Sequence, residues 1–175
     1  ESYFSNPTGA MVTIKCSPWH FEDKVLLMGD AAHAIVPFFG QGVNCCFEDC
    51  TYFNECLERH GANWQNLFDE FESLRKPNTD AIAELALENF IEMRDRVADP
   101  KFLLKKKVEQ ALEQRFPEIF VPKYSLVTFR RGPYSEALER GKVQDHILEE
   151  LCRSIDRVEE ANWEEAEHLL KRYYR

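Results

Sequence analysis

The chain has 175 residues, of which 44% are hydrophobic, and it carries a formal net charge of −9 at neutral pH. A chain of this length and apolar content can bury one core, or one core with a helical appendage. The acidic balance argues against nucleic acid and anionic membrane surfaces as partners, because both require a basic face on the protein.

Two strands are predicted near the start of the chain. Residues 9–16 alternate in polarity, and residues 25–28 form a short apolar run that Gly29 closes, which predicts a buried strand ending in a tight turn. Asp30 would then lie at the carboxyl end of that strand, where ligands collect in open α/β sheets. An ionised carboxylate at such a place can accept hydrogen bonds from sugar or ribityl hydroxyls.

A glycine-containing loop and a helix follow. Residues 37–42, Pro-Phe-Phe-Gly-Gln-Gly, form the loop, and the spacing from Val43 to about His60 predicts a helix that stops at Gly61. The start of a helix presents unpaired N–H groups and roughly half a positive charge. Such a site suits an anion, for example a reduced flavin ring.

The middle of the chain predicts two more helices. Asn63 can cap a helix over 64–76, which Pro77 is expected to break, and residues 78–97 carry the clearest amphipathic repeat. Its apolar face consists of Ile82, Leu85, Ala86, Asn89, Phe90 and Met93. Asn89 is unusual there, because a buried amide without a partner costs on the order of 1–3 kcal/mol. From the pattern alone it is either a satisfied core amide or a ligand contact.

Three further helices are predicted in the second half of the chain. Prolines at helix starts place two of them at about residues 99–116 and 133–154, and helical spacing places the third at 162–172. The last is amphipathic, which is typical of a helix that docks on protein, and its apolar face consists of Trp163, Ala166, Leu169 and Leu170. Pro117 and Pro122 bracket a loop, while 124–129 can be extended or helical because it is short and apolar.

The segment around Asp30 resembles a known family. The motif Gly29-Asp-Ala-Ala-His33, followed by residues 37–44 and by Phe47-Glu-Asp-Cys50, resembles the second FAD-contacting region of the flavin-dependent aromatic hydroxylases. Later segments of the chain agree with it, namely 89–94, 116–122 and 124–129. The resemblance covers residues 7–140 approximately.

This resemblance implies an FAD-dependent monooxygenase that hydroxylates L-kynurenine at ring position 3 with NADPH and O2, through a flavin C4a-hydroperoxide. Because the cofactor carries the chemistry, no catalytic side chain is expected. The cofactor contacts that the resemblance implies are Asp30, Gly42, Val43 and Asn44. The implied substrate contacts are Phe38, Gln41, Asn89, Met93 and Tyr124.

The expected fold class is α+β and mostly helical. Residues 1–75 are expected to hold the end of a substrate-covering sheet and the carboxyl-terminal part of an α/β, Rossmann-like FAD-binding domain, and residues 76–175 a helical domain. The chain lacks the Gly-x-Gly-x-x-Gly fingerprint, since residues 40–45 have Cys at the third glycine position. We therefore expect a carboxyl-terminal part of a longer enzyme, inactive without the missing amino-terminal part.

Several charged residues are interpreted as structural. His33 could be a general base, but a role in fixing the turn is favoured. Glu48 and Asp49 are expected in the first turns of their helix, where acids favour the dipole. Arg94 is not assigned to the substrate carboxylate, because the arginine of the family lies upstream of residue 1.

Cysteine usage and hydropathy bear on the surroundings of the protein. Six cysteines without a Cys-x-x-Cys pair predict reduced, mostly buried thiols and no metal site, which favours the cytoplasm. The longest apolar run, 34–39, is far shorter than the ~18 residues that span a bilayer, although an anchor beyond Arg175 stays open.

Two rival interpretations also stay open. One is another FAD-dependent aromatic hydroxylase or reductase of the same fold, which would keep Asp30 and the Gly-Gln-Gly loop but not Asn89 and Tyr124. The other is a non-catalytic helical interaction module, which the acidic surface and the amphipathic last helix would suit.

Overall fold

The computed structural model describes residues 2–130 and 132–174. The chain divides into two compact units, residues 1–86 and residues 87–175. The described residues are mostly helical with one small two-stranded sheet, so the predicted fold class is confirmed. The boundary at residue 75 between an FAD-binding part and a helical part stays a prediction.

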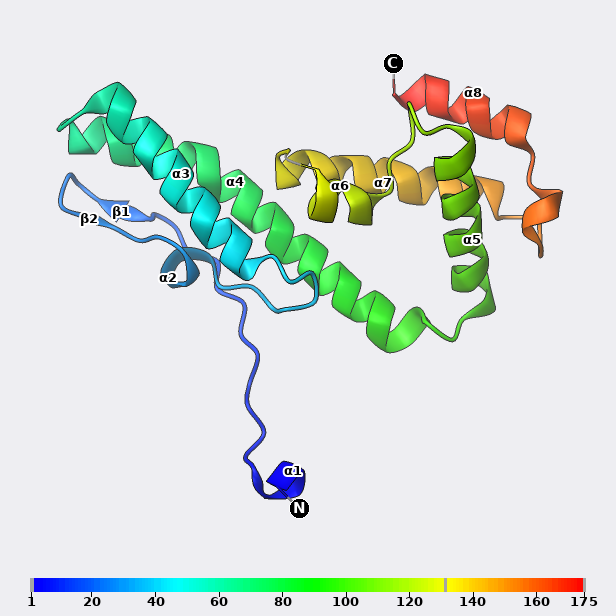
Figure 1. The fold of residues 1–175 in the computed structure, drawn as a ribbon, viewed down its shortest axis with the longest axis horizontal. Coiled ribbons are helices and arrows are strands. Elements are labelled where there is room, and N and C mark those ends of the chain that lie inside the picture. Colours follow the sequence, from blue (N-terminus) through cyan, green and yellow to red (C-terminus); the bar gives the residue numbers. More distant parts are fainter. Residues whose placement is uncertain (1, 131, 175) are drawn as a thin grey trace. The chain divides into compact units, whose positions relative to one another are not determined.

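The first unit begins with a short helix and a small antiparallel sheet. Helix α1 spans Ser2–Ser5, and strands β1 (His20–Phe21) and β2 (Val25–Leu26) pair with each other (Figure 1). The predicted strand over 9–16 is wrong, because that segment is irregular apart from one hydrogen bond, from the Ile14 N–H to the Ala34 carbonyl.

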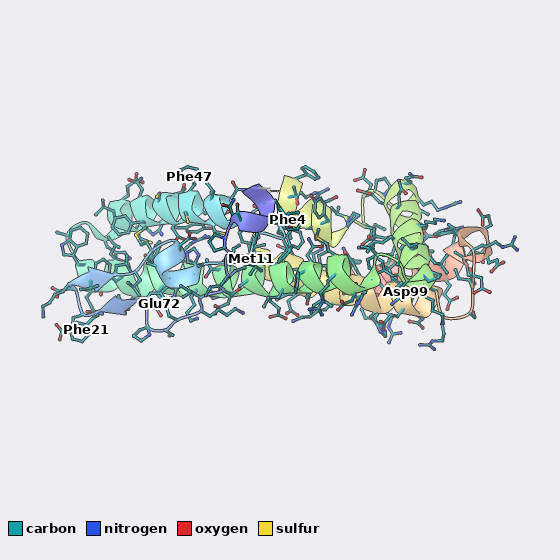
Figure 2. The ribbon with its side chains drawn as sticks, turned by 90° about the horizontal axis from the view of Figure 1, so that it is seen from below. Phe4, Met11, Phe21, Phe47, Glu72 and Asp99 are labelled. Carbon is teal, nitrogen blue, oxygen red and sulfur yellow. The ribbon has the colours of Figure 1, made fainter. Side chains whose placement is uncertain are left out.

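The predicted buried strand over 25–28 is also wrong in two respects. Only Val25 and Leu26 are paired, and Val25 is 52% exposed because the sheet has no further strand among the described residues. Phe21, on the other strand, is likewise exposed and lies at the edge of the unit (Figure 2). Asp30 does not end a strand but begins the short helix α2 (Asp30–His33).

Two long helices run side by side in the first unit (Figure 1). Helix α3 (Gly42–His60) ends as predicted at Gly61, which has a φ of 55° and whose N–H donates to the Leu57 carbonyl. Helix α4 spans Trp64–Ile91. The predicted cap is confirmed, since Asn63 Oδ1 accepts a hydrogen bond from the Asn66 N–H at 3.3 Å.

Pro77 lies inside α4 without ending it, so the predicted break is wrong. A proline in a helix removes the N–H that would bond to the carbonyl four residues earlier, which here belongs to Ser73. Because Ser73 is exposed, water can satisfy that carbonyl. The neighbouring turn gains a bond from a side chain, as Asn78 Nδ2 donates to the Leu74 carbonyl at 3.0 Å.

The core of the first unit joins the sheet, α2, α3 and α4. Its buried members are Trp19, Ala32, Cys56, Leu67, Phe68 and Phe71. The Trp19 indole N–H donates to the Cys16 carbonyl at 3.1 Å, and its backbone N–H donates to Glu72 at 3.0 Å. Trp19 therefore fixes the segment just before β1 to α4.

The second unit is helical throughout its regular elements. After α4, a π-helical turn η1 (Glu92–Arg96) leads to α5 (Pro100–Arg115), which Asp99 caps by accepting a hydrogen bond from the Lys101 N–H. The remaining elements are α6 (Lys123–Phe129), α7 (Tyr134–Leu151), the 3₁₀ turn η2 (Val158–Glu160) and α8 (Trp163–Tyr173). The ambiguous segment 124–129 is therefore helical.

Helix α7 is central in the second unit and packs on α5, α6 and α8. The shared core of α5, α7, α8 and the loop after α5 includes Leu112, Phe120, Ile147 and Leu170. On α8, the predicted docking face is confirmed, because Ala166, Leu169 and Leu170 are buried in this core. Arg115 adds a cation–π contact to Trp163, with its guanidinium 4.5 Å from the ring centre.

Among residues 2–130 and 132–174, no helix combines the length and apolarity that crossing a membrane would require. All six cysteines are free thiols, and three of them, at positions 45, 56 and 152, are buried. Within the same ranges, no group of three or more His, Cys, Asp or Glu side chains could hold a metal ion.

Candidate functional site

The turn at Gly29 and Asp30 lies directly beside α3. Gly29 has a φ of 58°, and a Cβ added to it would lie 3.2 Å from Cys46 Sγ. Both the backbone conformation and the close approach of α3 therefore require glycine here. The exposed Asp30 carboxylate begins α2 and lies 3.9 Å from the same sulfur atom. The Gly29 turn thus presents the Asp30 carboxylate to solvent, beside the beginning of α3.

The start of α3 is open on its backbone side. The side chain of Gln41, the N-cap residue, makes no capping hydrogen bond to the helix; its Oε1 accepts instead from Asn44 Nδ2 at 2.7 Å. A Cβ at Gly42 would meet only Ile35, at 3.8 Å. Val43 and Asn44 are exposed, whereas Gln41 is buried. The first helical turn therefore offers backbone N–H groups in an accessible place.

A buried ionic network fixes the Gly29 turn to α3 and α4. Asp49 Oδ2 accepts from the Gly29 N–H at 2.9 Å and lies 2.6 Å from His33 Nε2, while Asp49 Oδ1 accepts from Arg75 Nε at 2.7 Å. Asp49, His33 and Arg75 are all at most 3% exposed. Because buried charges are costly unless paired, this complete pairing makes the network a rigid support for the turn.

Arg75 carries the network across to the middle of α3. Its Nη1 lies 3.0 Å from Glu48, its Nη2 donates to the Cys45 carbonyl at 3.2 Å, and its guanidinium stacks on the Tyr52 ring at 4.9 Å. The flat, forked guanidinium can satisfy several acceptors at once, as a lysine in its place could not. One arginine of α4 thereby holds about two turns of α3.

The electrostatics of the network favour the ionised pair. Burial raises the pKa of Asp49, but hydrogen bonds from His33, Arg75 and the Gly29 N–H together lower this pKa below its ordinary value of 3.8. Burial lowers the pKa of Arg75, but hydrogen bonds and charge interactions with Asp49 and Glu48 outweigh burial and raise this pKa above its ordinary value. Both groups are therefore charged at neutral pH.

The structural interpretation of His33 agrees with this network, since its Nε2 is bonded to Asp49 and its ring lies 5.3 Å from Trp19. Glu48 and Asp49 lie in the early turns of their helix, but neither lies in its first turn, where the dipole acts. Both lie about two turns inside α3, and Asp49 is buried at the centre of the network. Sequence reasoning also missed Arg75, although a charged residue between Phe71 and Thr79 on a helix face was a detectable signal.

Of the expected substrate residues, Phe38 and Gln41 belong to the first unit, where Phe38 lies half-buried in the loop before α3. Asn89 and Met93 belong to the second unit and are in contact, with Asn89 Nδ2 3.8 Å from Met93 Sδ. Asn89 is half-buried, whereas Met93 in η1 is 54% exposed. The apolar face predicted for residues 78–97 thus loses its burial toward its end.

Tyr124 lies on α6 of the second unit and is 53% exposed. Its ring packs edge-on against Phe129, with ring centres 6.2 Å apart. The guanidinium of Arg94 donates two hydrogen bonds to the carboxylate of the neighbouring Asp95, at 2.6 and 2.7 Å. Arg94 thus forms an ion pair with its neighbour in the chain.

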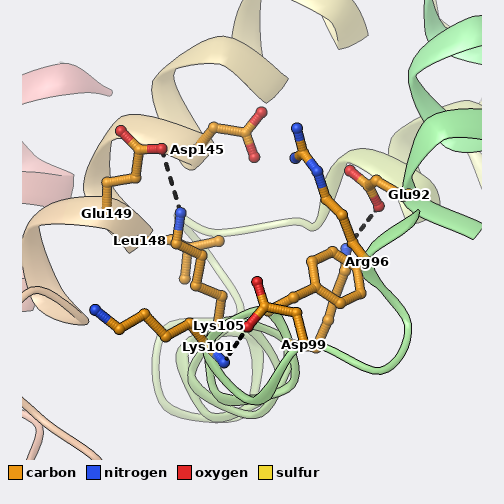
Figure 3. Close-up of a pocket in the computed structure, with 10 residues that line it drawn as sticks. Glu92, Arg96, Asp99, Lys101, Lys105, Asp145, Leu148 and Glu149 are labelled. Atoms are coloured by element: carbon orange, nitrogen blue, oxygen red, sulfur yellow. Dashed lines mark hydrogen bonds and ion pairs between the residues drawn. The ribbon is translucent and has the colours of Figure 1, made fainter.

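A cavity of about 380 Å³ lies in the second unit between η1, α5 and α7 (Figure 3). Its charged lining consists of four basic and four acidic side chains, and two pairs of them are in contact. Lys105 lies 3.2 Å from Glu149, and Lys106 lies 3.6 Å from Glu92. Asp99 caps α5 at the rim. These pairs neutralise the wall of the cavity, so it presents no concentrated charge to a ligand.

The first unit of the chain is similar to a known protein family. Residues 10–86 match the model of a family described as FAD binding domain. The matched range contains the Gly29 turn, the start of α3 and the Asp49 network, which is the whole of the site described in the first unit. The class of protein that this part of the chain resembles is therefore an FAD-binding one, as the motifs indicated.

The particular relatives are kynurenine 3-monooxygenases. The chain is 51% identical to that of Myxococcus xanthus over 98% of its own length and 50% identical to that of Christiangramia forsetii over 95%. It is 42% identical to that of Dictyostelium discoideum over 99% of its length. The chain spans 37% of the first two relatives and 41% of the third, so it corresponds to a part of these proteins. The resemblance to flavin-dependent aromatic hydroxylases is thus confirmed at the level of sequence.

Proposed function

We propose that the chain is the carboxyl-terminal part of an FAD-dependent aromatic monooxygenase that hydroxylates L-kynurenine at ring position 3 with NADPH and O2. The observation that carries the proposal is the bracing of the Gly29-Asp30 turn against α3 by Asp49, within the range that matches an FAD binding domain. It brings an exposed carboxylate and an open helix start into one small region.

The residues of this region fit FAD. The Asp30 carboxylate can accept hydrogen bonds from the hydroxyls of a ribityl chain or ribose. The backbone N–H groups of Gly42, Val43 and Asn44 can bond to the edge of the flavin ring, and the helix dipole favours negative charge there. Gly42 suits close approach of a ligand, because a residue without a side chain leaves its backbone N–H accessible.

When bound, FAD supplies the redox chemistry by which NADPH and O2 become a hydroxylating system. The side chains of this chain then have to bind and orient the aromatic substrate. Asn89 and Tyr124 are proposed to bond to its amino-acid end, and Gln41 to its carbonyl or amine. Phe38 and Met93 are proposed as the apolar wall beside the ring, which also excludes water.

The test uses the complete protein that contains this chain. L-kynurenine is expected to stimulate its NADPH oxidation, and Asn89→Ala or Tyr124→Phe is expected to raise the KM for L-kynurenine about five- to tenfold, the cost of about one hydrogen bond. Asn54→Ala and Tyr173→Phe serve as controls, because they remove the same groups from the surface of α3 and α8. Unchanged kinetics in both site variants would remove the substrate assignment.

The same assay separates the rival functions. Stimulation by a different aromatic acid, with no response to L-kynurenine, would point to another hydroxylase of this fold. Purification of the complete protein without bound flavin, and without uptake of added FAD, would favour a non-catalytic module. Six free thiols support a reducing compartment, so cytoplasmic residence is part of the proposal.

A further inference from the structure

One lysine of the second unit is surrounded by three carboxylates. The Lys123 ammonium lies 3.2 Å from Glu88, 3.7 Å from Asp145 and 4.0 Å from Glu92, and the side chain is only 13% exposed. Glu88 comes from the end of α4, Glu92 from η1 and Asp145 from α7. These four residues, the Lys123 cluster, connect the first residue of α6 to three other elements.

The backbone at Lys123 is held as well. Its N–H donates to Gln144 Oε1 at 2.8 Å, and Gln144 Nε2 donates to the Val121 carbonyl at 2.6 Å. Gln144 is 1% exposed. Buried amide bonds of this kind fix one arrangement of the groups they join, because a shifted backbone would leave a polar atom unpaired.

Space for the lysine side chain depends on a glycine. Gly141 lies inside α7, and a Cβ added there would lie 2.4 Å from Lys123 Cδ and 3.1 Å from Lys123 Cγ. A glycine in a helix interior costs about 1 kcal/mol relative to alanine. Its presence is explained by the passage of the Lys123 side chain across α7 toward the three carboxylates.

Members of the Lys123 cluster stand next to the proposed substrate residues in the chain. Each of three cluster residues immediately precedes a proposed substrate contact, in the pairs Glu88–Asn89, Glu92–Met93 and Lys123–Tyr124. The second pair lies in the π-helical turn η1, a rare local structure that recurs at functional sites. The Lys123 ammonium therefore connects the two segments that carry Asn89, Met93 and Tyr124, through its ion pairs with Glu88 and Glu92.

We propose that Lys123 is a positioning residue that sets the distance between Tyr124 on α6 and the Asn89–Met93 face of α4 and η1, and thereby tunes substrate binding. This inference rests on the proposed function. Lys123 makes no contact with the substrate itself. It acts through its ion pairs, which connect α6 to α4, η1 and α7.

The charges of the Lys123 cluster keep its ion pairs, which together we call the tether, in place at neutral pH. Burial lowers the pKa of Lys123, but Asp145, Glu88 and Glu92 together raise it above its ordinary value, so the ammonium stays charged at neutral pH. Lys106 lies 3.6 Å from Glu92 and 3.3 Å from Glu109, and so shares the negative charge of η1. An uncharged side chain at 123 would leave three carboxylates facing one another with less compensation.

The test compares four variants of the complete flavoprotein. Lys123→Met is expected to raise the KM for L-kynurenine about tenfold while kcat at saturating substrate changes less than twofold, because the effect is on placement of the binding groups. Lys123→Arg, which keeps the charge, is expected to recover most of the affinity. Gly141→Ala keeps every charge but blocks the path of the lysine side chain, and should reproduce the KM effect.

Lys105→Met is the matched control. It removes another lysine that joins two helices, α5 and α7, through a carboxylate 3.2 Å away, but no proposed substrate residue adjoins it. Its KM should stay within twofold of the parent. A KM increase as large as that of Lys123→Met would show a general loss of stability and would overturn the proposal, as would an unchanged KM in both Lys123→Met and Gly141→Ala.

Hydrogen exchange separates failure of this inference from failure of the proposed function. Lys123→Met should speed amide exchange in 123–129 at least tenfold, with exchange in α5 and α8 unchanged, whatever the substrate of the protein is. If L-kynurenine does not stimulate the parent protein, the proposed function fails while this loosening still supports the tether. Unchanged exchange in 123–129 contradicts the tether in either case.

Discussion

Asp49 shows how a single residue can support a site that it does not itself form. Its two oxygens take hydrogen bonds from α4, from α2 and from the backbone of the Gly29 turn. The exposed Asp30 carboxylate follows that turn directly, so the direction in which Asp30 points depends on the buried Asp49. A buried polar network of this kind is rigid only while every member is paired.

Replacing Asp49 by asparagine should therefore destabilise the protein strongly. Asp49→Asn keeps the shape of the side chain but leaves the buried Arg75 charge without its closest counter-charge, so we expect a loss of about 3–5 kcal/mol in the free energy of unfolding. Urea denaturation of the complete protein measures it. The control is Asp23→Asn in the exposed hairpin turn, which should change the free energy by less than about 0.5 kcal/mol. Equal effects of the two substitutions would contradict this account of the network.

At the scale of elements, the helices of the chain are set by local signals and by the faces they bury. Helix α4 is the exception in its middle, because Pro77 removes a backbone hydrogen bond and the helix continues nonetheless. Burial on both sides of the proline explains the continuity. Phe71 and Arg75 before it and Thr79 and Ile82 after it are all buried, and this packing outweighs a cost of about 3 kcal/mol for an interior proline.

Removal of that proline should consequently stabilise α4. Pro77→Ala restores an N–H donor for the Ser73 carbonyl, and we expect a gain of about 1–2 kcal/mol after the greater flexibility of the unfolded chain is subtracted. Thermal unfolding of the complete protein, compared with Gln65→Ala at an exposed position of the same helix, is the measurement. A lower melting temperature for Pro77→Ala would show that the proline conformation is itself required.

At the scale of the whole molecule, the acidic balance and the buried network have opposite relations to pH. A net charge of −9 repels itself at neutral pH, and acid relieves that repulsion. The lowered pKa of Asp49 acts the other way, since stability from a carboxylate with a depressed pKa is complete above its unfolded value and is lost as the pH falls through the folded pKa. Burial raises the pKa of Glu109, so protonation of this carboxyl group as the pH falls favours the folded protein.

We expect the parent protein to lose stability as the pH is lowered below about 4, near the unfolded pKa of Asp49. The Asp49→Asn variant, already destabilised, should show a smaller further loss over the same interval. Denaturation midpoints measured from pH 6 to pH 3 provide the comparison. Parallel pH profiles for the parent and the variant would assign the acid sensitivity to other carboxylates.

The sequence by itself determined what depends on neighbours in the chain. The helix cap at Asn63 and the stop at Gly61 were readable because a cap bonds within one turn, and the caps that the structure shows at Asp99 and Asn162 are local in the same way. The motif around Asp30 was likewise readable, because a family resemblance is carried by the order of residues. Packing of α8 followed from its periodicity, which the core of the second unit confirms.

Tertiary structure decided what depends on residues far apart in the chain. Asp49 meets Arg75 across 26 positions, and Lys123 meets Glu88 across 35, so no local pattern announces either contact. The same holds for the errors: the strand predicted over 9–16 finds no partner strand among residues 2–130 and 132–174, and packing around α4 overrules Pro77. A strand needs a neighbour to bond to, and a buried charge needs a partner brought to it by the fold.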